Sequence, residues 1–410
     1  MTDSTRKRTS KRAYGDGGID ERGEDVFRLR YRVNGKRFTK TFHGTKAEAR
    51  KELRALVRSG DTGDHVDPSK LTLGQWIDQW IASGAPGRRK KKVGQRTLER
   101  YEELLRVHVK PKLGSRPIQK LQATEIDQLY NELDALVDEE GERRIAPMTL
   151  HHVHTVFNSC LSTAERKGLV RNNPMMRVEQ VPSGGESDHG EALEEQDLAT
   201  LVAGFKSSAT MYALVAVDAA TGARRNELLA FRWTDLNIEQ KALRVERALE
   251  QTKKFGLRFK SPKTERGKRT VGLDDATMAI LLSERDKQLR MLAGIPAGVD
   301  VDLSLVRLPE DALIFSEPGT LNVPRNPRNF SKEFARRAER LGFGDFDFHH
   351  FRGTHATLLL DRGVPVHVVA ERIGDDPAVL LRNYAKRKRR QKANTDFSAQ
   401  ISALAASFLK

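Results

Sequence analysis

The sequence predicts a multidomain chain that is mainly α-helical and contains small β parts. Its 410 residues fit two or three domains of ordinary size. Apolar residues recur at helical spacing over most of the chain, and two polar stretches, 59–70 and 182–190, have the composition of linkers. We therefore expect an N-terminal module, a helical bundle, a mixed α+β domain and a C-terminal helix, over residues 1–60, 71–176, 190–395 and 396–410.

The first 60 residues predict a small sheet followed by a helix. Apolar and polar residues alternate from Val26 to Val33, which is typical of a half-buried strand. Asn34-Gly35 is a strong hairpin signal, so a second strand is expected over 37–42. Thr45, with Glu48 three residues later, predicts a capped helix that runs to about residue 57. The polar segment 1–23 is expected to be loose.

This N-terminal module holds much of the positive charge of the chain. Residues 1–60 contain 17 lysines and arginines against 8 acidic residues, a net +9 of the chain's +16. A basic sheet of this size can lie in a DNA groove, and a merely solvated sheet face is the alternative. The candidate DNA contacts on the two strands are Arg28, Arg30, Arg32, Lys36, Arg37 and Lys40.

Residues 71–176 predict a bundle of four amphipathic helices. Thr72 begins the first helix, in which Trp76 and Trp80 are spaced for one buried face. The other three helices are expected over 97–108, 124–137 and 148–167. A polar loop carries a basic run for which phosphate contact and simple solvation both remain open, namely Arg88, Arg89, Lys90, Lys91 and Lys92.

Composition excludes several classes of protein. The single cysteine, Cys160, rules out a disulfide scaffold, and His151, His152 and His154 lack an evident carboxylate or cysteine partner for a metal. No run approaches the ~18 apolar residues of a membrane helix, and the basic N-terminus lacks the apolar core of a secretory signal. The net charge of +16 instead indicates a polyanionic partner. We expect a soluble cytoplasmic protein that acts on nucleic acid or another polyanion.

The remaining residues predict one mixed, mostly helical domain. Helices are expected over 194–205, 209–221, 274–292, 328–341, 349–361 and 365–373, and strands over 242–248, 257–261 and 268–273. Beyond a basic stretch, residues 397–409 predict a final helix with an apolar stripe of Ile401, Leu404 and Phe408. That helix could dock on its own domain or on a neighbouring protomer.

Four segments of this domain combine cations with groups that can transfer a proton. They are Thr221–Glu227, Ser261–Thr264, Asp347–Ala356, and Arg372–Asp376 followed by Tyr384. A P-loop, an H-E-x-x-H motif and a nucleophile elbow are all missing from the sequence. Each segment alone has an ordinary explanation, such as a surface ion pair between Arg224 and Glu227. Their combination and order together indicate a catalytic site.

In that combination the chain resembles the tyrosine recombinases, the phage-integrase family of site-specific recombinases, over nearly its whole length. Thr221–Arg224 resembles the first arginine box, Ser-Pro-Lys-Thr at 261–264 the hairpin lysine, and His349–Arg352 the His-x-x-Arg box. Ile373-Gly374-Asp375 stands where the family has Leu-Gly-His, nine residues before its nucleophilic tyrosine. The resemblance implies a catalytic set of Arg224, Lys263, His349, Arg352, Asp375 and Tyr384.

The same resemblance implies the architecture and partners of a lambda-type integrase. It predicts a β-β-β-α module that binds arm DNA sites, a SAM-like helical domain that binds the core site, and a catalytic domain. It also implies a homotetramer on double-stranded DNA, a DNA-bending host factor, an excisionase, a nucleoid-associated location and no cofactor. The activity implied is integration or excision of a mobile element through a 3′-phosphotyrosine.

The residue types suit this chemistry independently of the family. Two arginines can clamp the non-bridging oxygens of a phosphate, a task that suits their fixed fork geometry. A phenol has a pKa of about 10, so Tyr384 needs a base, for which His349 is the natural candidate. Lys263 can then give a proton to the leaving 5′ oxygen. A phosphotyrosine keeps the broken bond available for rejoining, so neither ATP nor a metal is required.

Asp375 departs from the family pattern, which has histidine or sometimes tryptophan at this position. An ionised aspartate would repel the phosphate, so Asp375 turns away, contacts Arg352 or His349, or is protonated. His350 or His355 could supply the missing hydrogen-bond donor. Two alternatives to a recombinase therefore stay open, a catalytically weak or silent DNA-binding relative and a topoisomerase-like enzyme that relaxes DNA.

Overall fold

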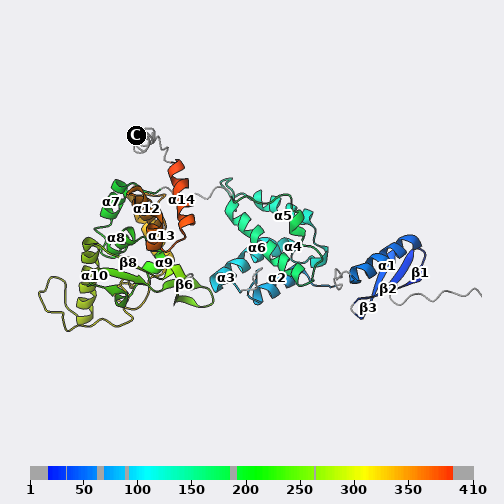
Figure 1. Cartoon of the computed structure of the whole chain (residues 1–410), viewed down its shortest axis with the longest axis horizontal. Coiled ribbons are helices and arrows are strands. Elements are labelled where there is room, and N and C mark those ends of the chain that lie inside the picture. Colours follow the sequence, from blue (N-terminus) through cyan, green and yellow to red (C-terminus); the bar gives the residue numbers. More distant parts are fainter. Residues whose placement is uncertain are drawn as a thin grey trace, which may run out of the picture. The chain divides into compact units, whose positions relative to one another are not determined.

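The computed structural model describes residues 17–33, 35–61, 69–87, 92–184, 192–262 and 265–390, without the side chains of 59–61, 265 and 386–390. The chain divides into two compact units, Met1–Ser187 and Asp188–Lys410 (Figure 1). The fold is multidomain and mainly helical with small antiparallel sheets, which confirms the predicted class.

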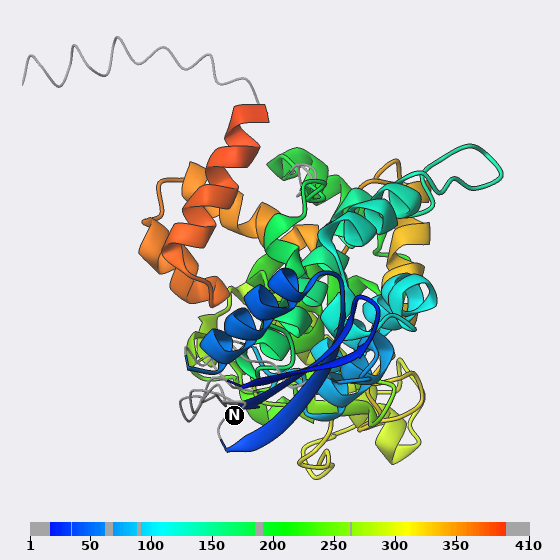
Figure 2. The ribbon, with the colours of Figure 1, turned by 90° about the vertical axis from the view of Figure 1, so that its right-hand side faces the viewer.

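The first unit begins with a three-stranded antiparallel sheet and a helix. The strands β1 (Gly18–Gly23), β2 (Val26–Val33) and β3 (Lys36–His43) are ordered β1-β2-β3, and α1 (Lys46–Asp61) lies across them (Figure 2). The alternation of β2 buries Phe27, Leu29, Tyr31 and Val33 against Ala49 and Leu53 of α1. Thr45 and Glu48 cap α1 as predicted, and Gly35 of the hairpin has a positive φ of 78°. Asn34 lies outside the described residues.

The strand β1 corrects one expectation from the residues. Segment 1–23 was expected to be loose, but Gly18–Gly23 pairs with β2, with Ile19 opposite Leu29. The strand has only one large apolar residue, so it shows no alternation that would reveal it. Backbone pairing and the 2.7 Å ion pair between Asp20 and Arg30 join it to β2. The β-β-β-α order implied by the resemblance is confirmed.

A helical bundle completes the first unit. Its elements are α2 (Leu73–Ala82), α3 (Gln95–Leu104), the π-helical turn η1 (Leu105–Val109), α4 (Lys110–Leu113), the 3₁₀ turn η2 (Ile118–Lys120), α5 (Ala123–Asp134), α6 (Pro147–Arg166) and the 3₁₀ turn η3 (Pro174–Arg177). Thr72 caps α2 in a capping box with Gln75, and Trp76 and Trp80 are buried in the core with Cys160, as predicted.

The histidines of α6 have protein partners. The Nδ1 atom of His151 lies 2.8 Å from the Pro182 carbonyl, and that of His154 lies 3.2 Å from the Tyr130 hydroxyl. Within the described parts of the chain, no group of three or more His, Cys, Asp or Glu side chains could hold a metal ion. In the same parts, no helix is both long and apolar enough to cross a membrane.

The second unit packs helices around two small antiparallel sheets, β4-β5-β8 and the hairpin β6-β7. Its helices are α7 (Glu195–Gly204), α8 (Tyr212–Thr221), α9 (Arg225–Leu228), α10 (Asp275–Ala293), α11 (Pro327–Arg340), α12 (His350–Asp361), α13 (Val366–Ile373) and α14 (Pro377–Arg390), with 3₁₀ turns η4 (Trp233–Asp235) and η5 (Glu265–Gly267). Its strands are β4 (Leu236–Asn237), β5 (Ala242–Val245), β6 (Ala248–Thr252), β7 (Gly256–Lys260) and β8 (Arg269–Gly272).

Two elements of this unit differ from the expectation. The strand expected over 242–248 is two strands in different sheets, because β5 pairs with β8 and β6 pairs with β7. Helix α14, which carries Tyr384, was not expected, since among its described side chains only Leu380 is buried and the sequence shows little apolar stripe. The predicted helix at 397–409 lies outside the described residues.

Candidate active site

The C-terminal end of α8 accepts hydrogen bonds from three side chains. The last carbonyl groups of a helix have no partner within it and form the negative end of its dipole. The carbonyls of Ala219, Ala220 and Gly222 accept from His355 Nδ1, Arg372 Nη2 and Arg352 Nη1, at 3.0, 3.0 and 3.2 Å. Gly222 ends the helix with a left-handed φ of 61°, so the Thr-Gly-Ala-Arg segment supplies both the turn and its acceptors.

The C-terminal end of α13 likewise accepts hydrogen bonds from side chains, in this case from three arginines. The carbonyl of Arg372 accepts from Arg269 Nε at 2.8 Å, that of Ile373 accepts from Arg352, and that of Gly374 accepts from Arg224 Nη2 at 3.0 Å. Gly374 has a φ of 67°, and a Cβ here would lie 2.8 Å from the Arg266 carbonyl oxygen. Arg224 and Arg352 therefore donate to adjacent carbonyls of one turn, which holds the two guanidinium groups together.

A buried carboxylate completes this arginine cluster, which consists of Arg224, Arg269 and Arg352. Glu227, 3% exposed, accepts from Arg224 Nη1 and from Arg269 Nη2, both at 2.9 Å. Burial raises the pKa of Glu227, but the charges and hydrogen bonds of Arg269 and Arg224 outweigh this and hold it below its ordinary value. Arg224, whose side chain is 39% exposed, therefore pairs with a buried carboxylate that it shares with the buried Arg269.

Arg352 is the most enclosed arginine with a predicted catalytic role. Its side chain is 7% exposed, and its Nη2 atom lies 3.3 Å from Asp375 Oδ2. Burial, together with nearby Arg224 and Arg269, lowers the pKa of the guanidinium to about 10, so it stays charged at neutral pH. Of the alternatives open for Asp375, the structure has the contact with Arg352.

The three histidines of this region have different surroundings. His349 precedes α12 and is exposed, and its backbone N–H donates to Asp347 Oδ1 at 2.7 Å. Partial loss of hydration lowers the pKa of its imidazole; Asp347 opposes the shift and Arg352 adds to it. His350 Nδ1 accepts the Asp347 N–H at 3.0 Å. A neutral His349 can accept a proton.

His355 does not offer a donor to a phosphate. Its Nδ1–H donates to Ala219, and its Nε2 accepts from Arg372 Nε at 3.0 Å. Burial and the charge of Arg372 lower its pKa to about 4, so the imidazole is neutral. Both ring nitrogens serve to fix α12 on α8 and α13.

Asp218, in the last turn of α8, is a buried acid that the sequence did not single out. Neither of its carboxyl oxygens has a hydrogen-bond partner among the described residues. Burial raises its pKa well above the ordinary value, against the opposing charge of Arg352. Asp218 is thus a fully buried carboxyl group close enough to the arginine cluster to feel the charge of Arg352.

The structure does not bring Tyr384 to the arginine cluster. Its hydroxyl donates to Asp361 Oδ1 at 2.7 Å. Asp361 is the last residue of α12, nine residues beyond Arg352, which corresponds to about 13 Å along the helix axis. Burial and the hydrogen bond to Asp361 raise the pKa of Tyr384 to about 12.

The predicted hairpin lysine and the predicted DNA contacts lie only partly within the described residues. Lys263 and Arg88, Arg89, Lys90 and Lys91 lie outside the described residues, and Lys92 is exposed. On the N-terminal module, Arg28, Arg30, Arg32 and Arg37 share the sheet face away from α1. The register places Lys36 and Lys40 on the α1 side, where Lys40 pairs with Glu52 at 2.7 Å.

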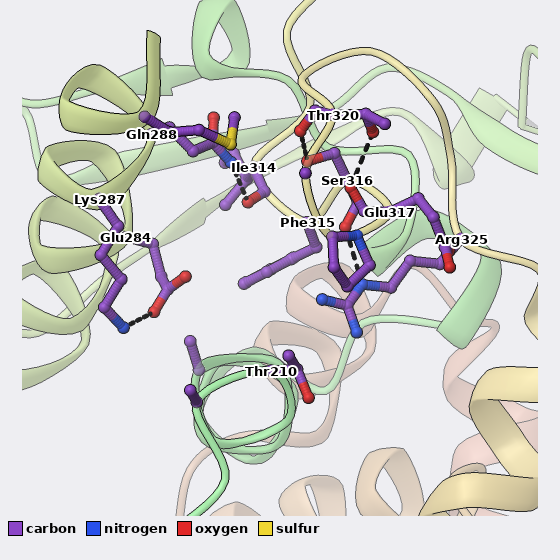
Figure 3. Close-up of a pocket in the computed structure, with 15 residues that line it drawn as sticks. Thr210, Glu284, Lys287, Gln288, Ile314, Phe315, Ser316, Glu317, Thr320 and Arg325 are labelled. Atoms are coloured by element: carbon purple, nitrogen blue, oxygen red, sulfur yellow. Dashed lines mark hydrogen bonds and ion pairs between the residues drawn. The ribbon is translucent and has the colours of Figure 1, made fainter. Parts of the chain in front are cut away.

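A separate pocket of about 140 Å³ lies between α10, the start of α8 and segment 314–325 (Figure 3). None of the predicted site residues lines it. Its polar groups hold the segment in place, since Gln288 Nε2 donates to the Leu313 and Ile314 carbonyls and Arg325 Nε to the Ser316 carbonyl. It has no evident part in the chemistry of the arginine cluster.

Comparison with known proteins gives matches along most of the chain. Residues 191–391 match the model of the phage integrase family, and residues 72–133 match the phage integrase N-terminal SAM-like domain. A "Tyrosine recombinase XerC-like" protein of Caldanaerobacter subterraneus subsp. tengcongensis is 26% identical over 372 residues, which cover 86% of this chain and 90% of the relative.

Two solved structures share the fold. The Tn1549 transposon integrase in complex with transposon right end DNA has a TM-score of 0.61 at 17% identity, over 83% of this chain and 100% of that one. A lambda integrase tetramer bound to a Holliday junction has a TM-score of 0.51 at 16% identity, over 89% and 94% of the two chains.

Proposed function

Because the chain belongs to the phage integrase family of tyrosine recombinases, enzymes that cut and rejoin DNA, we propose that it integrates or excises a mobile element through a 3′-phosphotyrosine formed by Tyr384. The observation that carries this proposal is the anchoring of Arg224 and Arg352 on adjacent carbonyls of α13. Two guanidinium groups fixed together in this way form a preorganised site for one phosphate.

The proposed reaction is a direct transfer of the phosphoryl group. The Tyr384 oxygen attacks phosphorus, its proton passes to His349, and the bond from phosphorus to the 5′ oxygen breaks as Lys263 supplies a proton to that oxygen. The arginines stabilise the charge that develops on the non-bridging oxygens. Rejoining is the reverse attack by a 5′ hydroxyl on the phosphotyrosine, and the bond energy is conserved throughout.

The buried network supports the role proposed for the arginines. Glu227 and the α13 carbonyls use donors of Arg224 and Arg352 that point into the protein, so the guanidinium positions are set before DNA arrives. Such groups need little reorganisation during the reaction, which is the main source of electrostatic catalysis. Arg269, which is fixed by Glu227 and two carbonyls, acts as a positioning residue for this pair.

The other parts of the chain are proposed to hold DNA. In this proposal residues 1–60 bind arm sites through the open face of β2 and β3, residues 71–176 bind the core site with help from the 88–92 run, and residues 190–395 carry the chemistry. The DNA complex of the Tn1549 integrase and the tetramer of lambda integrase on a Holliday junction support a tetramer that works on DNA. A DNA-bending host factor, an excisionase and docking by residues 396–410 belong to the same proposal.

The contact between Asp375 and Arg352 favours one alternative, a weak or silent DNA-binding relative. The carboxylate occupies a donor that the phosphate would use, so it competes with the substrate. A suicide substrate built from the ends of the integrated element separates the two functions. We expect a covalent protein–DNA adduct with the wild type and none with Tyr384→Phe, whereas DNA binding without an adduct would contradict the enzyme. Strand exchange between two sites then distinguishes a recombinase from a topoisomerase-like enzyme.

A further inference from the structure

Helix α12 carries the proposed phosphate site at one end and holds the proposed nucleophile at the other. His349 directly precedes its first turn, Arg352 lies in that turn, and Asp361 is its C-terminal residue. The Tyr384 hydroxyl donates to Asp361 Oδ1 at 2.7 Å, which is a short, charge-assisted hydrogen bond. In this arrangement the tyrosine cannot attack a phosphate that is held by Arg352.

The neighbouring helix α14 also links the region of Arg352 to that of Asp361. It begins at Pro377, two residues after Asp375, which contacts Arg352, and Tyr384 lies seven residues beyond Pro377. That spacing is about 10 Å along the axis, roughly two turns. In α14 as it stands, Tyr384 is therefore set away from the arginine cluster, toward the far end of α12.

We infer that Asp361 is a positioning residue that holds Tyr384 in a resting place away from the phosphate site. This inference rests on the proposed role of Tyr384 as the nucleophile. The carboxylate accepts a hydrogen bond from the phenolic O–H and thereby favours the neutral hydroxyl where no phosphate is present. Cleavage then requires α14 to move so that the hydroxyl leaves Asp361 and reaches the arginine cluster.

The position of Asp361 suits this role better than a structural one. A negative charge at the C-terminal end of a helix is unfavourable for the helix dipole, so Asp361 does not stabilise α12 by its place in the sequence. The adjacent Arg362 forms its own ion pair, with Glu195 at 2.7 Å. This second pair offers a matched control, because Glu195→Gln removes an acid at the same helix end without touching Tyr384.

The first test measures the contact itself in the DNA-free protein. The protein is labelled with fluorotyrosine, and the ¹⁹F resonance of Tyr384 among the six tyrosines is assigned with Tyr384→Phe. We expect Asp361→Asn to lower the pH at which this resonance titrates, and Glu195→Gln to leave it unchanged. An unchanged titration in Asp361→Asn would overturn the inference.

The second test measures the consequence for cleavage. On saturating suicide substrate in a single turnover, we expect Asp361→Asn to form the adduct roughly fivefold faster than wild type, because a neutral acceptor holds the hydroxyl less strongly. DNA affinity and the rate of Glu195→Gln should stay at wild-type values. A slower rate in Asp361→Asn would show that the carboxylate assists the active state and would overturn the inference. An adduct in none of the variants, wild type included, would instead overturn the proposed function, while the titration would still report on the contact.

Discussion

The arginines of β2 and β3 and those of the arginine cluster have the same chemistry but opposite surroundings. Arg28, Arg32 and Arg37 lie exposed on an open sheet face, whereas Arg269 and Arg352 are buried. The buried groups donate to helix-end carbonyls and to Glu227, and each position is fixed by several bonds. Exposed cations add salt-sensitive affinity for a polyanion, while fixed buried cations can stabilise one charge at one place.

The largest effect should come from changing the geometry of a fixed cation. Arg352→Lys keeps the charge but cannot donate to Gly222, Ile373 and Asp375 together. We expect the single-turnover rate of adduct formation to fall by about 10²- to 10³-fold, with DNA affinity changed only a few-fold. A rate within a factor of ten of wild type would mean that bulk charge, and not fixed geometry, serves the phosphate.

The second prediction removes the carboxylate that anchors two cations. Glu227→Gln leaves Arg269 buried without its ionic partner and should lower the free energy of unfolding by about 3 kcal/mol at pH 7, measured by urea denaturation. Because the folded-state pKa of Glu227 lies below its ordinary value of about 4.3, its contribution is complete above that pH and is lost as the pH falls further. The difference between variant and wild type should therefore shrink below about pH 4. A constant difference down to pH 3 would contradict the ionic explanation.

The third prediction concerns the exposed face. We replace Arg28, Arg30, Arg32 and Arg37 together by alanine and measure binding to arm-site DNA at several salt concentrations. The slope of log K against log salt concentration should become less steep by about 3 to 4. Cleavage of a substrate that contains only the core site should not change. Lys40→Ala, on the α1 side of the same sheet, is the control and should leave the salt dependence almost intact. Equal effects of the control and a single change such as Arg28→Ala would show that the two faces do not differ in DNA contact.

The smallest effect is expected at Asp375. Asp375→His removes the carboxylate that contacts Arg352 and introduces a donor, so adduct formation should be retained or raised by a few-fold. The rate is measured beside that of Asp375→Asn, which removes only the charge. A large loss in both variants would show that the carboxylate has a required role of its own.

The sequence predicted the parts of the molecule that depend on local pattern. The strand from Val26 to Val33 and the α2 start at Thr72 follow from alternation and capping within a few residues. The helix expected over 209–221 is α8, which ends at the Gly222 turn. The roles of the catalytic candidates stay predictions, although the structure brings Arg224, Arg352 and Asp375 together.

What the sequence missed depends on contacts between distant segments. Arg269 meets Glu227 from 42 residues away, and Tyr384 meets Asp361 from 23 residues away. No periodicity or motif links such pairs, because tertiary packing alone makes them neighbours. The sequence also could not decide among the alternatives for Asp375. Its contact with Arg352 depends on how α13 packs on α12, which no local pattern reveals.

The most direct test of the proposed function identifies the protein atom that carries the DNA. The adduct formed on a suicide substrate is digested with nuclease and protease, and the modified peptide is sequenced by mass spectrometry. The predicted result is a nucleotide joined through its 3′ phosphate to Tyr384. A nucleotide on any other residue, or a linkage through a 5′ phosphate, would contradict the proposed mechanism.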